Sequence, residues 1–245
     1  MRKNKAMAEQ KVTMKNKVFD LIIFDVDSTL VTVEGLDWLA RLKGKEREVA
    51  DLTKQSMNGL VRLEDVFEKK MNLIRPSYKD LANLGIKYCE SIVPGVIEVL
   101  AALQFLKKEV FILTGNFDPA VSMLAEYLHI LEKNVISNDI YFHEDGRYKG
   151  FNNKGPLSIN GGKKTILKKM IGRKKIVFVG DGATDVEAKN AVDLFVGFGG
   201  VVRRKHVEKN SDVYLSGKSM YPLLSIVLSK KEKQILKDKH RKVKT

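Results

Sequence analysis

Short apolar runs along the chain alternate with longer stretches in which apolar residues recur every three or four positions. Short apolar runs are typical of buried strands, and the longer period is typical of amphipathic helices. Their alternation predicts a doubly wound, Rossmann-like α/β core in which helices cover both faces of a parallel sheet. The predicted strands are 19–24, 110–113, 176–179 and 194–196, the predicted helices are 96–106, 119–128, 163–171 and 183–190, and a β-hairpin is predicted at 140–151.

One segment interrupts this alternation. Residues 36–89 carry helical periodicity, are rich in Leu, Met, Lys and Glu, and contain no strand pattern. An insert after the first strand lies over the crevice in which open α/β sheets bind ligands, so we expect a cap of about four helices. The predicted parts are a core of residues 18–33 and 92–228, a helical cap of residues 34–91, and basic tails at residues 1–17 and 229–245.

The formal charge of +14 at pH 7 is concentrated at the two ends of the chain. Residues 1–17 hold six Lys and Arg against one acidic residue, and residues 229–245 hold eight against two, which leaves +3 between them. Such tails attract polyanions in a salt-sensitive way. They lack interleaved aromatic residues on which bases could stack, so we expect weak polyanion contact through solvated tails rather than a dedicated nucleic-acid site.

Two further features bear on where the protein works. Cys89 is the only cysteine, which excludes an internal disulfide and fits a reducing compartment. No apolar run approaches the roughly 18 residues that a membrane span requires, and the basic first residues lack the apolar stretch of a secretory signal. We therefore expect a cytoplasmic protein without a membrane span.

Four groups of polar residues stand at the ends of predicted strands or at the start of a predicted helix. Because the carboxyl ends of parallel strands meet at one edge of a sheet, we expect these groups to converge although they are far apart in the sequence. The groups are Asp25 with Asp27, Thr114-Gly115-Asn116, Lys163 after Asn160-Gly161-Gly162, and Asp181 with Asp185 in the segment GDGATD.

Four carboxylates held close together need cations if they are to stay ionised. Lys163 supplies one positive charge, and the all-oxygen surroundings favour a hard divalent ion such as Mg²⁺. The Thr114 hydroxyl and the amides of Gly115 and Asn116 are suited to hold phosphate oxygens, helped by the N-terminus of the following helix. A metal, a phosphate cradle, a lysine and a spare carboxylate together predict phosphoryl transfer.

These motifs, in this order, resemble those of the haloacid dehalogenase superfamily. The segment DVDST after the first strand, a hydroxyl-glycine pair after the second, a lysine and GDGATD match its four motifs. Within the superfamily the chain is similar to the phosphoserine phosphatases over residues 18–224. The segments VEGLDWLA, MNGL and LIRPS in the predicted cap, and FVGFGG with VVRRK after the last motif, extend the resemblance.

The resemblance implies a phosphatase that forms an aspartyl-phosphate intermediate. Asp25 would be the nucleophile, and Asp27 would be the general acid and then the general base. Asp25, Asp181 and the backbone carbonyl of Asp27 would bind Mg²⁺, with Asp185 holding this shell in place. The other implied roles are charge balance at the phosphoryl group for Thr114 and Lys163, and substrate contacts for Glu34, Met57, Leu63, Lys70, Thr184 and Arg204, of which Glu34 would face an amine.

Three positions depart from the family pattern. Asn116 replaces a glycine and adds bulk beside the phosphate site, and Leu63 replaces a bulky aromatic residue. Lys70 replaces the arginine that clamps the substrate carboxylate, so the charge is kept but the bidentate fork is lost. Phosphoserine is the predicted substrate, and another small phosphorylated metabolite, such as phosphohomoserine, is the alternative. An alternative of a different class is a polyanion-binding protein that uses its basic tails.

Overall fold

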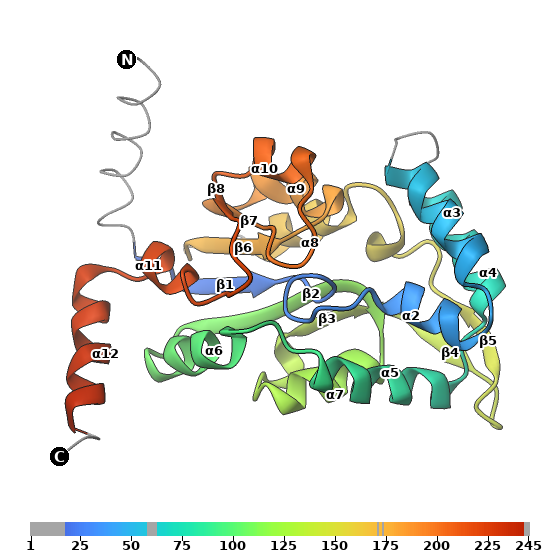
Figure 1. The fold of residues 1–245 in the computed structure, drawn as a ribbon, viewed down its shortest axis with the longest axis horizontal. Coiled ribbons are helices and arrows are strands. Elements are labelled where there is room, and N and C mark those ends of the chain that lie inside the picture. Colours follow the sequence, from blue (N-terminus) through green and yellow to red (C-terminus); the bar gives the residue numbers. More distant parts are fainter. Residues whose placement is uncertain (1–17, 58–62, 171, 173, 243–245) are drawn as a thin grey trace.

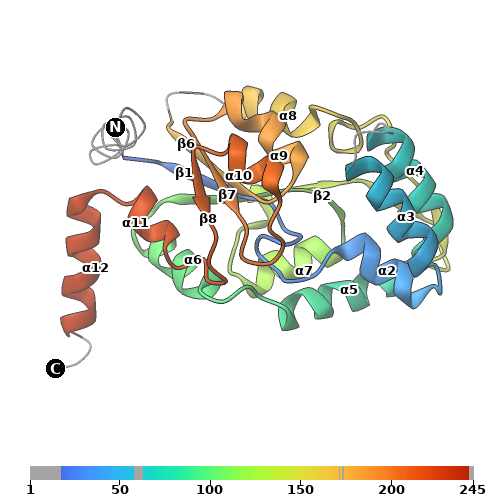
Figure 2. The same cartoon turned by 45° about the horizontal axis from the view of Figure 1, so that its top comes forward.

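The core of the fold is a six-stranded parallel sheet with helices on both faces, as Figures 1 and 2 show. The computed structural model describes residues 18–57, 63–170, 172 and 174–242. The strand order is β3-β2-β1-β6-β7-β8, and β4 and β5 form a separate hairpin, which confirms the predicted doubly wound α/β core. The strands are β1 (Leu21–Phe24), β2 (Glu109–Phe117), β3 (Val135–Asn138), β4 (Ile140–Phe142), β5 (Tyr148–Phe151), β6 (Ile176–Gly180), β7 (Leu194–Phe198) and β8 (Val213–Leu215).

Strand β1 lies near the middle of the sheet and is buried along its whole length. It pairs in parallel with β2 on one side and with β6 on the other. Successive side chains of a strand point to opposite faces, so Ile22 and Phe24 pack into one hydrophobic core and Leu21 and Ile23 into the other. The run of apolar residues ends at Asp25, which therefore leaves the sheet at the centre of its carboxyl edge.

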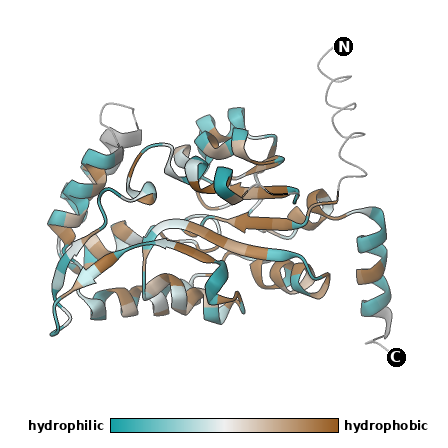
Figure 3. Ribbon diagram, turned by 180° about the vertical axis from the view of Figure 1, so that it is seen from behind, coloured by the Kyte–Doolittle hydropathy of each residue, from teal (hydrophilic) through white to brown (hydrophobic). Residues whose placement is uncertain are grey.

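Helices α5, α6 and α7 lie on one face of the sheet, and α8, α9 and α10 lie on the other (Figure 1). The strands between them are mostly apolar, and polar residues gather on the outer helices (Figure 3). The predicted core helices match α6 to α9 to within two residues at each end. These six helices are α5 (Tyr78–Glu90), α6 (Val96–Phe105), α7 (Ala120–Tyr127), α8 (Gly162–Met170), α9 (Ala183–Ala188) and α10 (Lys205–Asn210).

Most of the described residues between β1 and α6 lie in helices, as their periodicity predicts. Helices α2 (Gly35–Leu42), α3 (Glu46–Met57) and α4 (Leu63–Ile74) lie together beyond the carboxyl edge of the sheet (Figure 2). Helix α5 instead packs on α7. The two helices lie so close at Gly85 that a Cβ atom added there would be 3.2 Å from the Ala120 Cα. The segment predicted as a cap is thus joined to the core through α5.

An aromatic cluster connects this helical segment to the sheet and to the β4–β5 hairpin. The ring of Phe67, on α4, stacks against Phe117 of β2 with centroids 5.8 Å apart. The same ring meets Phe151 of β5 edge to face at 5.4 Å. The hairpin predicted at residues 140–151 therefore packs against α4 as well as pairing its own two strands.

The C-terminal part of the chain contains two helices, α11 (Leu223–Val227) and α12 (Lys230–Lys242). Helix α12 occupies most of the predicted C-terminal tail and lies at the end of the molecule opposite α2–α4 (Figure 1). Its Glu232 lies 2.6 Å from the Nζ of Lys108, whose side chain is 4% exposed, so an ion pair anchors α12 to the core. The region is therefore an attached helix where a solvated tail was expected.

The remaining regular elements of the described chain are three short 3₁₀ helices, Glu132–Asn134, Pro156–Ser158 and Lys189–Ala191.

Within the described residues, none of the helices has the length and apolar character needed to cross a membrane.

Candidate active site

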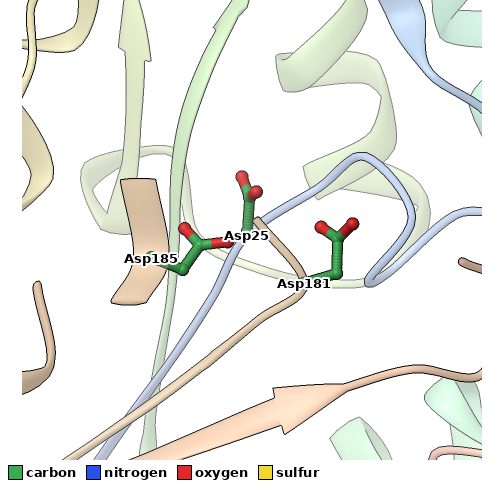
Figure 4. A group of neighbouring side chains, drawn as sticks. All are labelled: Asp25, Asp181 and Asp185. Carbon is green, nitrogen blue, oxygen red and sulfur yellow. The ribbon is translucent and has the colours of Figure 1, made fainter. Parts of the chain in front are cut away.

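Three buried carboxylates converge at the carboxyl edge of the sheet. Asp25 follows β1, Asp181 follows β6, and Asp185 lies in the first turn of α9 (Figure 4). One oxygen of each carboxylate lies within 4.8 Å of the others. Since β1 and β6 are neighbouring parallel strands, they bring Asp25 and Asp181 side by side although the two are far apart in the sequence.

Lys163 lies between two of these carboxylates. Its Nζ is 2.8 Å from Asp25 Oδ1 and 2.7 Å from Asp185 Oδ1. Burial disfavours the charged amine, but the charges of Asp185 and Asp25 outweigh burial and raise the pKa of Lys163. Burial raises the pKa of Asp25 to about 6, against the opposing charge of Lys163. Lys163 is therefore a permanent positive charge beside the nucleophile predicted from the sequence.

The position of Lys163 depends on the residue before it. Helix α8 begins at Gly162, and a side chain there would collide with the carbonyl oxygen of Pro156. Glycine therefore allows α8 to begin against the 3₁₀ helix and to carry Lys163 into the site.

The Asp27 carboxyl is held at both of its oxygens. The backbone amide of Gly35 donates to Oδ2 at 2.7 Å, and the Tyr88 hydroxyl donates to Oδ1 at 2.8 Å. Burial, together with the charge of Glu34, raises the pKa of Asp27 to about 8. At neutral pH this carboxyl is therefore mainly protonated, which suits a group that donates a proton.

The predicted phosphate cradle, Thr114-Gly115-Asn116, lies within β2, which continues to Phe117. The register between β2 and β3 shifts in this stretch, and such irregularities re-aim side chains near sites. The buried Thr114 hydroxyl accepts hydrogen bonds from the backbone amide of Asn116 at 3.2 Å and from its side chain at 3.3 Å. Helix α7 begins at Ala120, one residue after its predicted start, and none of its described residues lines the cavity, so the expected help from its N-terminus stays a prediction.

Arg204 bridges two carboxylates across the site. Its Nη2 lies 2.9 Å from Glu34 Oε1 and 3.0 Å from Asp181 Oδ2. The Ser28 hydroxyl donates to the same oxygen of Glu34 at 2.7 Å. Burial and the charge of Asp185 raise the pKa of Asp181 well above its usual range, and Arg204 offsets only part of this shift. Glu34 is thus fixed in place at the edge of the carboxylate cluster.

These groups line one cavity of about 220 Å³ between the sheet edge and α2–α4. On the side of these helices, Lys70 Nζ lies 3.6 Å from Asp37 Oδ1. The Thr53 hydroxyl donates to the same oxygen at 3.4 Å, and Phe67 adds an apolar wall. The cavity therefore has a cationic side chain opposite its carboxylate cluster.

Most residues predicted from the sequence line this cavity. Asp185 lies behind the lining, fully buried and bonded to Lys163 and to the amide of Gly182. The side chains of Met57 and Leu63 lie outside the described part of the structure. The predicted residues in the lining are Asp25, Asp27, Glu34, Lys70, Thr114, Gly115, Asn116, Lys163, Asp181, Thr184 and Arg204.

Sequence reasoning missed Asp37, Thr53, Phe67 and Tyr88. Asp37 lies in the first turn of α2, within the segment VEGLDWLA, so its place in a matched segment was an available signal. Thr53 and Phe67 lie in helices whose apolar periodicity favours a packing role. Tyr88 meets Asp27 across 61 positions, and no pattern in the sequence pairs the two.

The carboxylate cluster fits a divalent metal ion. Oxygen ligands at this separation suit a hard cation such as Mg²⁺ or Ca²⁺. Both oxygens of Asp185 accept hydrogen bonds, from Lys163 and Gly182, and both oxygens of Asp181 accept them from Thr29 and Arg204. Lys163 contacts Asp25 at Oδ1, so Oδ2 of Asp25 is the most available ligand atom of the three carboxylates. The raised pKa values of Asp25 and Asp181 show that nearby cations do not fully compensate their burial, and a metal ion would supply the missing charge.

Comparison with known proteins identifies close relatives. A family model of haloacid dehalogenase-like hydrolases matches residues 19–193. Over 200 residues the chain is 38% identical to the phosphoserine phosphatase of Bos taurus and 36% identical to that of Homo sapiens, covering 80% of this chain and 89% of each relative. A solved phospho-aspartyl intermediate analogue of phosphoserine phosphatase is 26% identical with a TM-score of 0.71, covering 86% of this chain and 100% of the other.

Proposed function

The chain belongs to the haloacid dehalogenase-like hydrolases and, within them, to the phosphoserine phosphatase-like family, and we propose that it hydrolyses O-phosphoserine to serine and phosphate with Mg²⁺. It is a phosphoric monoester hydrolase. The observation that carries the proposal is the pair Asp25 and Asp27 at the end of the central strand. Asp25 contacts Lys163 there, and Asp27 has a pKa of about 8. The two neighbouring carboxyls therefore differ in protonation, as a nucleophile and a general acid require.

The reaction proceeds in two steps. A carboxylate oxygen of Asp25 attacks phosphorus, the bond from phosphorus to the serine oxygen breaks, and Asp27 gives its proton to that oxygen. Asp27, now ionised, takes a proton from water, and the resulting hydroxide attacks phosphorus and releases phosphate from Asp25. Lys163 and the Thr114 hydroxyl balance the charge of the transferred group throughout.

Mg²⁺ would be held by the carboxylates of Asp25 and Asp181 and by the backbone carbonyl of Asp27, with Asp185 supporting the arrangement through Lys163 and Gly182. When bound, the ion neutralises charge on the phosphoryl oxygens.

The substrate assignment rests on two oppositely charged side chains in the cavity lining, Glu34 and Lys70. Glu34 offers a carboxylate to an amine, and Lys70 offers a cation to a carboxylate, with Thr184 and Arg204 also in the lining. A small amino-acid phosphate has both groups. Met57 and Leu63 complete the proposed set of contacts, and residues 34–91 act as the cap over the substrate, joined to the core through α5. Another small phosphorylated metabolite, such as phosphohomoserine, is the alternative substrate. We place the enzyme in the cytoplasm, since Cys89 is its only cysteine.

Phosphate release tests the proposal directly. The full-length protein is incubated with phosphoserine, phosphohomoserine and a panel of other small phosphomonoesters, once with Mg²⁺ and once with a chelator. We expect Mg²⁺-dependent turnover with the highest kcat/KM for phosphoserine. A higher kcat/KM for another ester would keep the reaction and replace the substrate, and no turnover of any ester would overturn the proposal.

A further inference from the structure

We propose that Tyr88 is a positioning residue that aims the Asp27 carboxyl at the oxygen of the departing alcohol. The proposal rests on the phosphatase function above and adds a residue that lies outside all four motifs of the sequence. It follows from the hydrogen bonds of Asp27, from the burial of Tyr88 and from the elements that carry each donor.

The Tyr88 side chain is fully buried, and its hydroxyl faces the site. Tyr88 has no exposed surface, although it is among the largest side chains of the core. Its hydroxyl donates to Asp27 Oδ1 at 2.8 Å, so the polar atom of this buried ring is satisfied by the proton-transferring group itself. A tyrosine needed only for packing could be a phenylalanine at this position.

Donors from different elements fix the Asp27 carboxyl, and the Asn116 side chain of β2 adds a further hydrogen bond to it. Tyr88 reaches Oδ1 from α5, and the backbone amide of Gly35 reaches Oδ2 from the first residue of α2. Rotation of an aspartate carboxyl about its last bond is otherwise broad. Bonds to opposite oxygens restrict that rotation and so hold the carboxyl in one orientation in the lining of the cavity.

The surroundings keep the Tyr88 hydroxyl at this point. A side chain at Gly35 would collide with that hydroxyl, so glycine both supplies the second donor and leaves room for the first. Helix α5 is itself packed closely on α7 at Gly85. Tyr88 is therefore held by the core, whereas α2 carries the second donor, Gly35.

The test compares Tyr88→Phe with wild type on two substrates. Phosphoserine releases an alkoxide that needs a proton, whereas p-nitrophenyl phosphate releases a weakly basic phenolate that leaves without one. We expect kcat/KM for phosphoserine to fall about 3- to 10-fold, the range for one hydrogen bond between neutral groups. The value of kcat/KM reports the steps up to departure of the leaving group. Because p-nitrophenolate leaves without a proton from Asp27, we expect kcat/KM for p-nitrophenyl phosphate to change less than about twofold.

Tyr78→Phe is the matched control, because Tyr78 lies on the same helix, is 53% exposed and is outside the cavity lining. It should leave both substrates unchanged. If Tyr88→Phe lowers kcat/KM equally for both substrates, Tyr88 has a structural role only. If kcat/KM for phosphoserine does not fall, Tyr88 has no role in the reaction. Either result overturns the inference. Failure of the proposed function can be distinguished from failure of this inference by the wild type alone. If the proposed function is wrong, the wild type hydrolyses neither phosphoserine nor another alkyl ester, and the role of Tyr88 is then wrong as well.

Discussion

At Asp25, a single substitution can separate the contribution of the side chain to phosphate release from its contribution to stability. Burial raises its pKa to about 6, so its ionised form opposes folding at neutral pH when no metal is bound. Asp25→Asn keeps the size of the side chain and removes both the nucleophile and this charge, while Lys163 retains Asp185 as a partner. We expect phosphate release to be abolished and the Tm in metal-free buffer not to fall, as measured by thermal unfolding.

Asp51→Asn is a suitable control, because Asp51 is an exposed aspartate on α3. It should change neither turnover nor Tm. An Asp25→Asn enzyme that still releases phosphate at a wild-type rate would contradict the covalent mechanism, and a large loss of Tm would contradict the view that ionised Asp25 opposes folding.

Lys70 is the residue on which substrate recognition most depends. It points into the cavity and pairs with Asp37 at 3.6 Å, which is long for a single-point contact. An arginine at this position would offer a planar fork to a substrate carboxylate. We expect Lys70→Arg to lower KM for phosphoserine about tenfold, corresponding to about 1–2 kcal/mol, with kcat little changed.

The carboxylate-free substrate ethanolamine phosphate is the control for this prediction. Its KM should not respond to Lys70→Arg, because it lacks the group that the arginine would bind. An unchanged KM for phosphoserine would show that Lys70 serves Asp37 rather than the substrate.

At the level of single residues, the sequence could predict those groups whose position follows from a strand end. Asp25 and Asp181 meet because parallel strands end together, and Lys163 because a glycine lets α8 begin beside them. The contact of Tyr88 with Asp27 could not be predicted, because it depends on how helices pack. Helix packing is set by side-chain shape over the whole contact, and no local pattern records it.

At the level of elements, a strand could be predicted from the sequence where it forms a continuous buried apolar run, and could not be predicted where it is very short and only partly buried. Strands β1, β6 and β7 are buried throughout, so their sequences are continuous apolar runs. Strands β3 and β8 have four and three residues and are only partly buried, so their apolar runs are too short to be distinguished from loop segments. The polar residues of α12 likewise resemble a solvated tail, because one ion pair and a few apolar contacts hold it.

The Lys108–Glu232 pair is the element-scale feature with a measurable effect on stability. Glu232 accepts from Ser229 at the start of α12 and contacts Lys108, whose Nζ also donates to the Phe19 carbonyl at 2.6 Å. Glu232→Gln would leave Lys108 buried without a counter-charge. We expect a loss of about 1–3 kcal/mol at pH 7 by urea unfolding, reduced from a fully buried pair because Glu232 is partly exposed.

The pH dependence of this loss follows from the pKa of Glu232. Burial raises that pKa, but the hydrogen bonds from Lys108 and Ser229 outweigh burial and lower it below 4.5. The pair therefore stabilises the fold above pH 4.5, and this contribution is lost as the pH falls through the folded pKa. The difference between wild type and Glu232→Gln should shrink below pH 4.5, whereas Asp238→Asn, an exposed change on the same helix, should show no such pattern. A difference that is constant down to pH 3 would show that the charge of Glu232 is not what anchors α12.

At the level of the whole molecule, positive charge is concentrated at the ends and negative charge at the site. Residues 1–17 and 229–245 hold +11 of the +14, and the site gathers the carboxylates of Asp25, Asp181 and Asp185. Helix α12 is far from α2–α4, which form one wall of the cavity (Figures 1 and 2). Polyanion contact through these ends and turnover at the site are therefore expected to be independent.

Two variants can test this independence without disturbing the anchor of α12. One lacks residues 1–17, and the other carries Lys230→Gln, Lys231→Gln and Lys237→Gln, three exposed positions that leave Glu232 in place. We expect the wild type to be retained on heparin at low salt and both variants to elute earlier, because fewer counterions are released on binding. Their kcat/KM for phosphoserine should match the wild type. If the wild type is not retained even at low salt, the polyanion-binding alternative fails. If either variant loses turnover while keeping its Tm, the ends take part in catalysis and the separation of charge from chemistry is wrong.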